Sequence, residues 1–209
     1  MEQTISQLIA RVAEDPALVL APIVALVLSY LFFYQGFLGR IGNNNKFWRT
    51  VRSVLPYIDS HAREQGFYTS YSIEKKERVG SLKVQGLDAI QILYGKGYID
   101  NPVAAHKTDW HGRKEIASLA HYGYSSSEIR SWGKVKKFFM MAFVVRYQTH
   151  VTLFKRGTDD IVVTAHYEYS PYNVFHAYQH FRGKGYDVKK GVERVAEDLD
   201  DVDTFVLGE

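Results

Sequence analysis

The sequence predicts an α+β protein in which one hydrophobic helix precedes a body with a small antiparallel sheet. Three observations predict this class: a long uncharged stretch at residues 16–39, two alternating segments at 147–154 and 161–169, and helical patterns on both sides of them. The predicted divisions are a short extracytoplasmic N-terminus at 1–16, a transmembrane helix at 17–38, a linker at 39–46, an α+β domain at 47–192 and an acidic tail at 193–209.

The uncharged stretch is long enough to cross a bilayer. Its 24 residues would form a helix of about 36 Å, against a hydrocarbon core of about 30 Å. Four basic residues follow it at positions 40, 46, 49 and 52, whereas only Arg11 precedes it. The positive-inside rule therefore predicts a single-pass signal anchor with the C-terminal body in the cytoplasm. A cleaved signal peptide fits poorly, because no basic segment comes first and no small-residue cleavage site follows.

The first half of the body reads mainly as helices. We expect helices at 47–65, 87–94, 113–122 and 126–132, with a strand at 67–73. Pro56 should interrupt the first helix, and Gly123 should end the third. Ser125 and Glu128 have the spacing of a capping box, which predicts the start of the fourth.

The second half carries the sheet, which we place at about 138–169. The apolar run 138–145 suits either a buried strand or a helix. The alternating segments 147–154 and 161–169, joined around Gly157, predict a hairpin. Helices are expected at 174–181 and 188–199.

Composition excludes some chemistry and indicates the sign of a partner. Without cysteine, the chain has no disulfide, thiolate metal site or cysteine nucleophile. Residues 17–192 carry 24 Lys and Arg against 13 Asp and Glu. Such a body is attracted to anionic lipid headgroups, nucleic acid or an acidic protein.

Two histidines suggest a metal site. His176 and His180 are four residues apart in a predicted helix, which is the spacing of two zinc ligands in metalloprotease helices. Glu168 or His166, on the preceding predicted strand, would supply a third ligand. The glutamate that follows the first histidine in those enzymes is absent, since Ala177 stands there. The alternative interpretation is a pair of surface histidines.

Three weaker patterns leave alternatives open. His106, Asp109 and His111 resemble an acid/base cluster, or simply loop packing around a tryptophan. Residues 115–130 have the rhythm of a helix-turn-helix, which any two short helices around a glycine turn share. A basic surface is expected at Lys134, Lys136 and Lys137, beside aromatic residues, where it would contact phosphates or the inner leaflet.

These observations favour a membrane-anchored, non-enzymatic interaction or structural domain, a subunit of a larger membrane or envelope assembly. Its partners would be lipid along residues 17–38, a protein, and anionic headgroups, with no cofactor. The first alternative is a membrane-tethered, metal-dependent hydrolase that holds zinc in a His/Glu cluster. The second is a membrane-tethered nucleic-acid-binding protein.

Overall fold

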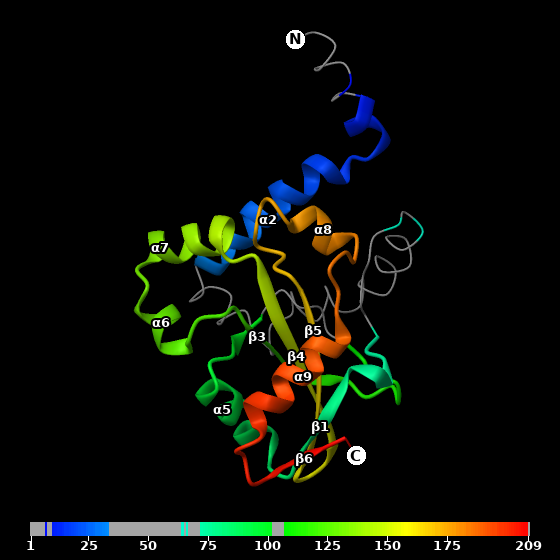
Figure 1. The fold of residues 1–209 in the computed structure, drawn as a ribbon, viewed down its shortest axis with the longest axis vertical. Coiled ribbons are helices and arrows are strands. Elements are labelled where there is room, and N and C mark those ends of the chain that lie inside the picture. Colours follow the sequence, from blue (N-terminus) through cyan, green and yellow to red (C-terminus); the bar gives the residue numbers. More distant parts are fainter. Residues whose placement is uncertain are drawn as a thin grey trace, which may run out of the picture.

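The computed structural model describes residues 7, 10–33, 64, 66, 72–101 and 107–208. The predicted helix at 47–65, the strand at 67–73 and the linker at 39–46 lie wholly or almost wholly outside these residues. The described part is α+β: one antiparallel sheet with helices packed on one face and across one end (Figure 1).

The sheet has six strands in the order β2-β3-β4-β5-β1-β6, and every neighbouring pair is antiparallel. The strands are β1 (Arg78–Leu82), β2 (Ile99–Asp100), β3 (Glu115–His121), β4 (Tyr147–Gly157), β5 (Asp160–Tyr169) and β6 (Phe205–Leu207). The central hairpin β4–β5 matches the hairpin that the sequence predicts. Strands β1, β2 and β6 were not expected, and β6 lies in the segment predicted as an acidic tail.

The hydrophobic core lies on one face of the sheet. Odd-numbered side chains of β4 and β5, such as Val151 and Val163, pack there against α5 (Gly86–Gly95) and α9 (Val188–Leu199). Both helices were predicted, and α9 has the expected bounds. Gly191 brings α9 close to the sheet, since a Cβ there would lie 2.3 Å from the Cα of His166.

The short helices lie at one end of the sheet. They are α6 (Ser126–Ser131), α7 (Lys134–Phe139), the π-helical turn η2 (Met140–Val144) and α8 (Ala177–Phe181); a 3-10 turn, η1 (Lys75–Glu77), lies elsewhere, directly before β1. As predicted, Ser125 caps α6, because its side chain accepts from the Glu128 amide while the Glu128 carboxylate accepts from the Ser125 amide.

Two segments differ from the sequence prediction. Residues 115–121, expected in a helix, form β3, because pairing with β4 overrides the helix propensity of Ala and Leu. The helix-turn-helix reading is therefore wrong. Residues 138–144 are helical, so the sheet does not begin at 138. Met141, Ala142 and Val145 are buried, which is a helical spacing rather than alternation.

Helix α2 (Ala17–Phe33) occupies most of the predicted span, and its continuation to residue 38 lies outside the described residues. Among the described helices, none combines the length and hydropathy that crossing a membrane requires. The small residues Ala21 and Ala25 of α2 pack against Ala177 of α8. Just before α2, Asp15 pairs with Arg182 at 2.6 Å. The N-terminal half of α2 is thus held against the body.

Candidate metal centre

The face of the sheet opposite the core is polar and buried. Even-numbered residues of β4 and β5 point toward it, and they face one another across the hairpin. Phe154 and Val162 are apolar and pack against Ile73 and Trp110, whereas the buried polar members are Gln148, His150, Thr152, Thr164, His166 and Glu168, each at most 8% exposed. Residues 72–77 and 107–110 contact this face. Burying so many polar side chains is costly unless they are paired with one another or with a ligand.

Three donor atoms form a nearly equilateral triangle at the centre of this face. The Nδ1 atom of His150 lies 3.2 Å from Nε2 of His166, and each of these nitrogens lies 3.5 Å from Oε1 of Glu168. Ligands about 2.0–2.1 Å from a tetrahedral zinc ion are about 3.3–3.4 Å apart. The triangle therefore has the size of one face of a zinc coordination tetrahedron.

The strand geometry explains why these three side chains meet. His150 and His166 are directly opposite in the β4–β5 register, and Glu168 follows two residues after His166 on the same face. Cross-strand neighbours and i,i+2 neighbours are the closest side chains on one face of a sheet. No loop is needed to bring the three together.

Each potential ligand also contacts a neighbouring polar side chain that fixes its orientation. The second ring nitrogen of His166, Nδ1, lies 2.8 Å from Oε2 of Glu77, and Nε2 of His150 lies 2.6 Å from Oγ of Ser118. The Gln148 side-chain amide donates to Oε1 of Glu168 at 2.6 Å. Histidines that bind metals usually have their other ring nitrogen held in this way, which fixes the tautomer and the ring orientation.

The charges of the cluster also suit a cation. The buried Lys107 has its Nζ atom 3.3 Å from Nδ1 of His150. Burial lowers the pKa of Lys107, while the carboxylates of Glu168, Glu77 and Glu115 attract its charge and oppose that shift. With neutral histidines, one ammonium group thus faces three carboxylates in this part of the described structure. A divalent cation would balance that excess of negative charge.

The ionisation of His150 and of Glu168 bears on metal binding. Burial, together with the charge of Lys107, lowers the pKa of the His150 imidazole to about 3. Burial raises the pKa of Glu168, but the positive charges that His180 and His166 carry when protonated, together with hydrogen bonds from His150 and His166, outweigh it, so this pKa lies well below its usual range. Neutral imidazole and ionised carboxylate are the forms that bind metal ions.

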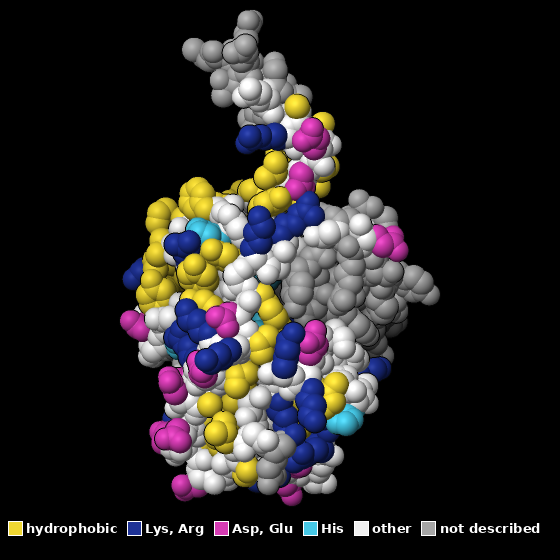
Figure 2. All heavy atoms as spheres, turned by 45° about the vertical axis from the view of Figure 1, so that its right-hand side comes forward, with side chains coloured by type: hydrophobic (Ala, Val, Ile, Leu, Met, Phe, Trp, Pro, Cys, Tyr) yellow, Lys and Arg dark blue, Asp and Glu magenta, His cyan; other side chains and the backbone are white. Residues whose placement is uncertain are grey.

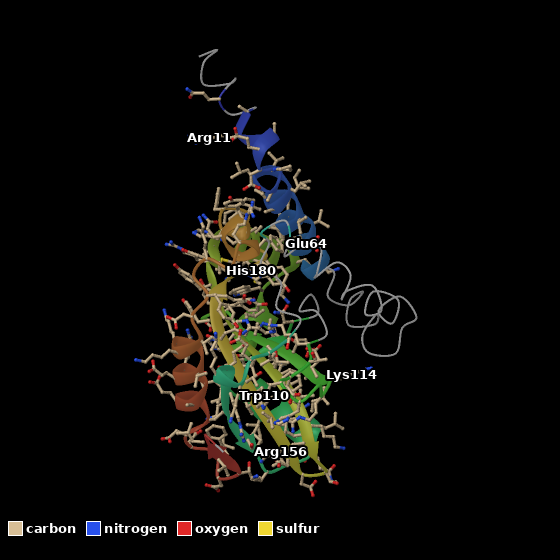
Figure 3. All side chains as sticks on the ribbon, turned by 90° about the vertical axis from the view of Figure 1, so that its right-hand side faces the viewer. Arg11, Glu64, Trp110, Lys114, Arg156 and His180 are labelled. Carbon is tan, nitrogen blue, oxygen red and sulfur yellow. The ribbon has the colours of Figure 1, made fainter. Side chains whose placement is uncertain are left out.

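Of the predicted ligands, the structure brings Glu168 and His180 together but not His176. Nδ1 of His180 lies 3.3 Å from Oε2 of Glu168, at the end of β5 near α8 (Figure 3). His176 instead stacks on Tyr169 and contacts Asn173 at 3.0 Å. Helix α8 begins only at Ala177, so the two histidines do not share a helix face as the spacing suggested.

Comparison with known proteins gave a plain result. No protein-family model, no curated protein and no solved structure matches this chain. The chemistry of the site is therefore inferred from its own geometry.

The other predicted cluster has a structural explanation where it is described. Oδ1 of Asp109 accepts hydrogen bonds from the backbone amides of His111 and Arg113, and its Oδ2 pairs with the Arg113 guanidinium at 2.6 Å. The carboxylate closes a turn. His106 lies outside the described residues.

Sequence reasoning missed His150, Glu77, Ser118 and Lys107. For His150 a signal existed, because the predicted hairpin around Gly157 places residue 150 opposite residue 166. For the other three no local signal exists, since they come from segments that only the fold brings to this face.

Proposed function

We propose that this protein is a membrane-attached metalloprotein, with hydrolysis as its reaction class, in which His150, His166 and Glu168 bind a divalent transition metal such as zinc. The donor triangle carries the proposal. Two histidines and one carboxylate are one of the ligand sets of catalytic zinc sites, which keep a position open for water or substrate. Such a metal, when bound, activates water and polarises a carbonyl or phosphoryl oxygen.

The surrounding side chains would each have a definite task. Glu77 and Ser118 hold the two imidazoles in their tautomers, and Gln148 orients the Glu168 carboxylate. The Lys107 ammonium group would stabilise negative charge that develops on a bound substrate, because burial strengthens its field.

Metal analysis tests the proposal directly. The full-length protein, purified in detergent without chelators, should contain about one zinc per chain, or bind it in calorimetric titration. His150→Ala and Glu168→Ala should abolish stoichiometric binding. Glu77→Gln keeps the three ligands and should weaken binding about 10–100-fold.

His176→Ala is the matched control, because His176 lies directly before α8 and contacts Asn173 and Tyr169 rather than the three proposed ligands. It should bind zinc as the unchanged protein does. Absence of bound metal in a protein with normal circular dichroism would refute the metal centre. Equal losses in His176→Ala and His150→Ala would refute this choice of ligands.

For the membrane, we propose that residues 17–38 attach the protein to lipid. Exposed Leu20, Ile23 and Val27 on α2, each at least 50% exposed, support this. A single crossing with a cytoplasmic body stays a prediction of the sequence. Flotation with liposomes tests attachment, and protease protection in sealed vesicles tests the crossing.

A second candidate function is a non-enzymatic interaction domain within a membrane assembly. It is favoured by a stack of half-buried tyrosines, in which Tyr147 lies 5.1 Å from Tyr167 and 4.7 Å from Tyr169, with Arg146 over two of the rings. Tyrosine and arginine are enriched at protein interfaces. A metal-free protein whose cross-linking to one defined membrane partner is lost in Tyr147→Ala would favour this reading. The nucleic-acid alternative keeps only the basic residues, since its helix-turn-helix is absent.

A further inference from the structure

A second feature of the molecule is an exposed apolar surface at the end of the body where α2 joins it. Hydrophobic side chains gather there in Figure 2. From the body it contains Val135 and Phe139 of α7, Val144 of η2 and the loop residue Phe175, which are 45–78% exposed. These are large side chains to leave in water.

The phenylalanines of this surface are in contact with one another. Phe143 contacts both Phe139, at 5.3 Å between ring centroids, and Phe175, at 6.1 Å. Helix α2 packs against α7, η2 and α8, so its own exposed Leu, Ile and Val side chains border the same cluster. The surface of the body thus continues that of the hydrophobic segment.

Basic residues predominate beside α7 and η2, although Glu128 of α6 interacts with Lys136 and Asp15 pairs with Arg182 near α8. Lys134 and Lys136 are exposed on α7, and Arg146 is exposed where the chain leaves η2 for β4. No Asp or Glu occurs in the sequence between Glu128 and Asp159. An apolar patch bordered by lysine and arginine fits the interface of a bilayer with anionic headgroups, where apolar side chains enter the acyl boundary and cations meet phosphates.

We infer that α7, η2 and Phe175 form a membrane-docking surface, which seats the body directly on an anionic bilayer beside the attached segment. The inference rests on the proposed membrane attachment of residues 17–38 and goes beyond it. The surface fixes the orientation of the body at the membrane. Arg182 and α8 hold Asp15 and the N-terminal half of α2 against the body. That half of α2 should therefore lie at the surface of the bilayer, beside the docked body.

The absence of cysteine makes a site-specific test straightforward. Single-cysteine variants Phe139→Cys and Leu87→Cys of the full-length protein would carry an environment-sensitive fluorophore. Leu87 is the matched control, because it is a large apolar residue, 77% exposed, on α5. Both proteins would be reconstituted into vesicles of phosphatidylcholine with or without phosphatidylglycerol, with brominated lipid as the quencher.

With anionic vesicles, the probe at 139 should shift to the blue and be quenched, while the probe at 87 should do neither. Lys134→Gln and Lys136→Gln should each weaken the docked state about fivefold, and added salt should do the same. A probe at 139 that behaves like the one at 87, in a protein that floats with the vesicles, would overturn the docking surface and leave the attachment intact. Such a result would mean that a crossing segment alone, or a protein partner, accounts for the apolar side chains. A protein that does not float would overturn both.

Discussion

Replacing Gly191 with alanine should destabilise the fold, although alanine is the better helix former. A Cβ at this position would lie 2.3 Å from Cα and 2.4 Å from the carbonyl carbon of His166, and 2.6 Å from the amide nitrogen of Tyr167. These are backbone atoms of β5, which cannot rotate away. Helix α9 must therefore withdraw from the sheet by about 1 Å to restore ordinary contact.

The cost can be worked from what that withdrawal opens. Val195 and Leu199 of α9 are fully buried in the core, and burying each is worth about 1.5–3 kcal/mol. A gap of about 1 Å forfeits about a quarter to a half of such contacts, and strain adds about 1–3 kcal/mol. The gain in helix propensity is only about 1 kcal/mol. These terms give a net loss of about 1–5 kcal/mol, and its midpoint of about 3 kcal/mol would lower the melting temperature by about 6–12 °C.

The assay is thermal unfolding of the full-length protein in detergent with a chelator, followed by circular dichroism. Gly95→Ala is the matched control, because Gly95 ends α5 and nothing lies within 4 Å of its added Cβ. That variant should be unchanged or more stable by up to about 1 kcal/mol. Equal melting temperatures for the two variants would refute the steric reasoning.

Three further predictions concern single side chains. Tyr98→Phe removes the 2.6 Å hydrogen bond from a buried phenol to Asp198 and should cost about 1–2 kcal/mol in urea denaturation, against no change if water replaces it. Burial, together with the charge of Arg194, lowers the pKa of His121, so the unfolded chain binds the imidazole proton more readily than the folded protein does. The free energy of unfolding should therefore fall as the pH drops below about 6.5, and it should fall less in His121→Gln. Identical pH dependence in the two proteins would contradict this. Ser125→Ala should cost about 1 kcal/mol and increase amide hydrogen exchange in α6, whereas Ser125→Asp should largely restore both.

The parts of the fold that the sequence predicted are those with strong local signals. The hairpin and α9 repeat their burial pattern over ten or more residues, and α6 has its capping box. The prediction for β3 was wrong because Glu115–His121 contains good helix formers, and only pairing with the neighbouring β4 makes this segment a strand. Strands β1 and β6 are short, and their pairing depends on residues about 80 and 125 positions apart along the chain.

Part of the candidate site could be predicted from the sequence. Glu168 and His166 were considered from the sequence because they alternate on a predicted strand, but the helix spacing of His176 and His180 drew attention to α8. That helix has only five residues and starts after His176, so the spacing had no structural counterpart. Glu77 joins the cluster from 89 positions before His166, a separation that no local pattern can reveal.

The order of strands has a consequence for how the chain matures. Strand β1 is made early, yet its two neighbours in the sheet, β5 and β6, come from the last quarter of the chain. During synthesis from the N-terminus, residues 78–82 have no sheet partners until β5 has been made. Glu77 lies directly before β1, so its carboxylate can pair with His166 only after β5 has been made, when most of the chain has been translated. A nascent chain stalled before residue 160 would contain α2 and β1 but neither His166 nor Glu168.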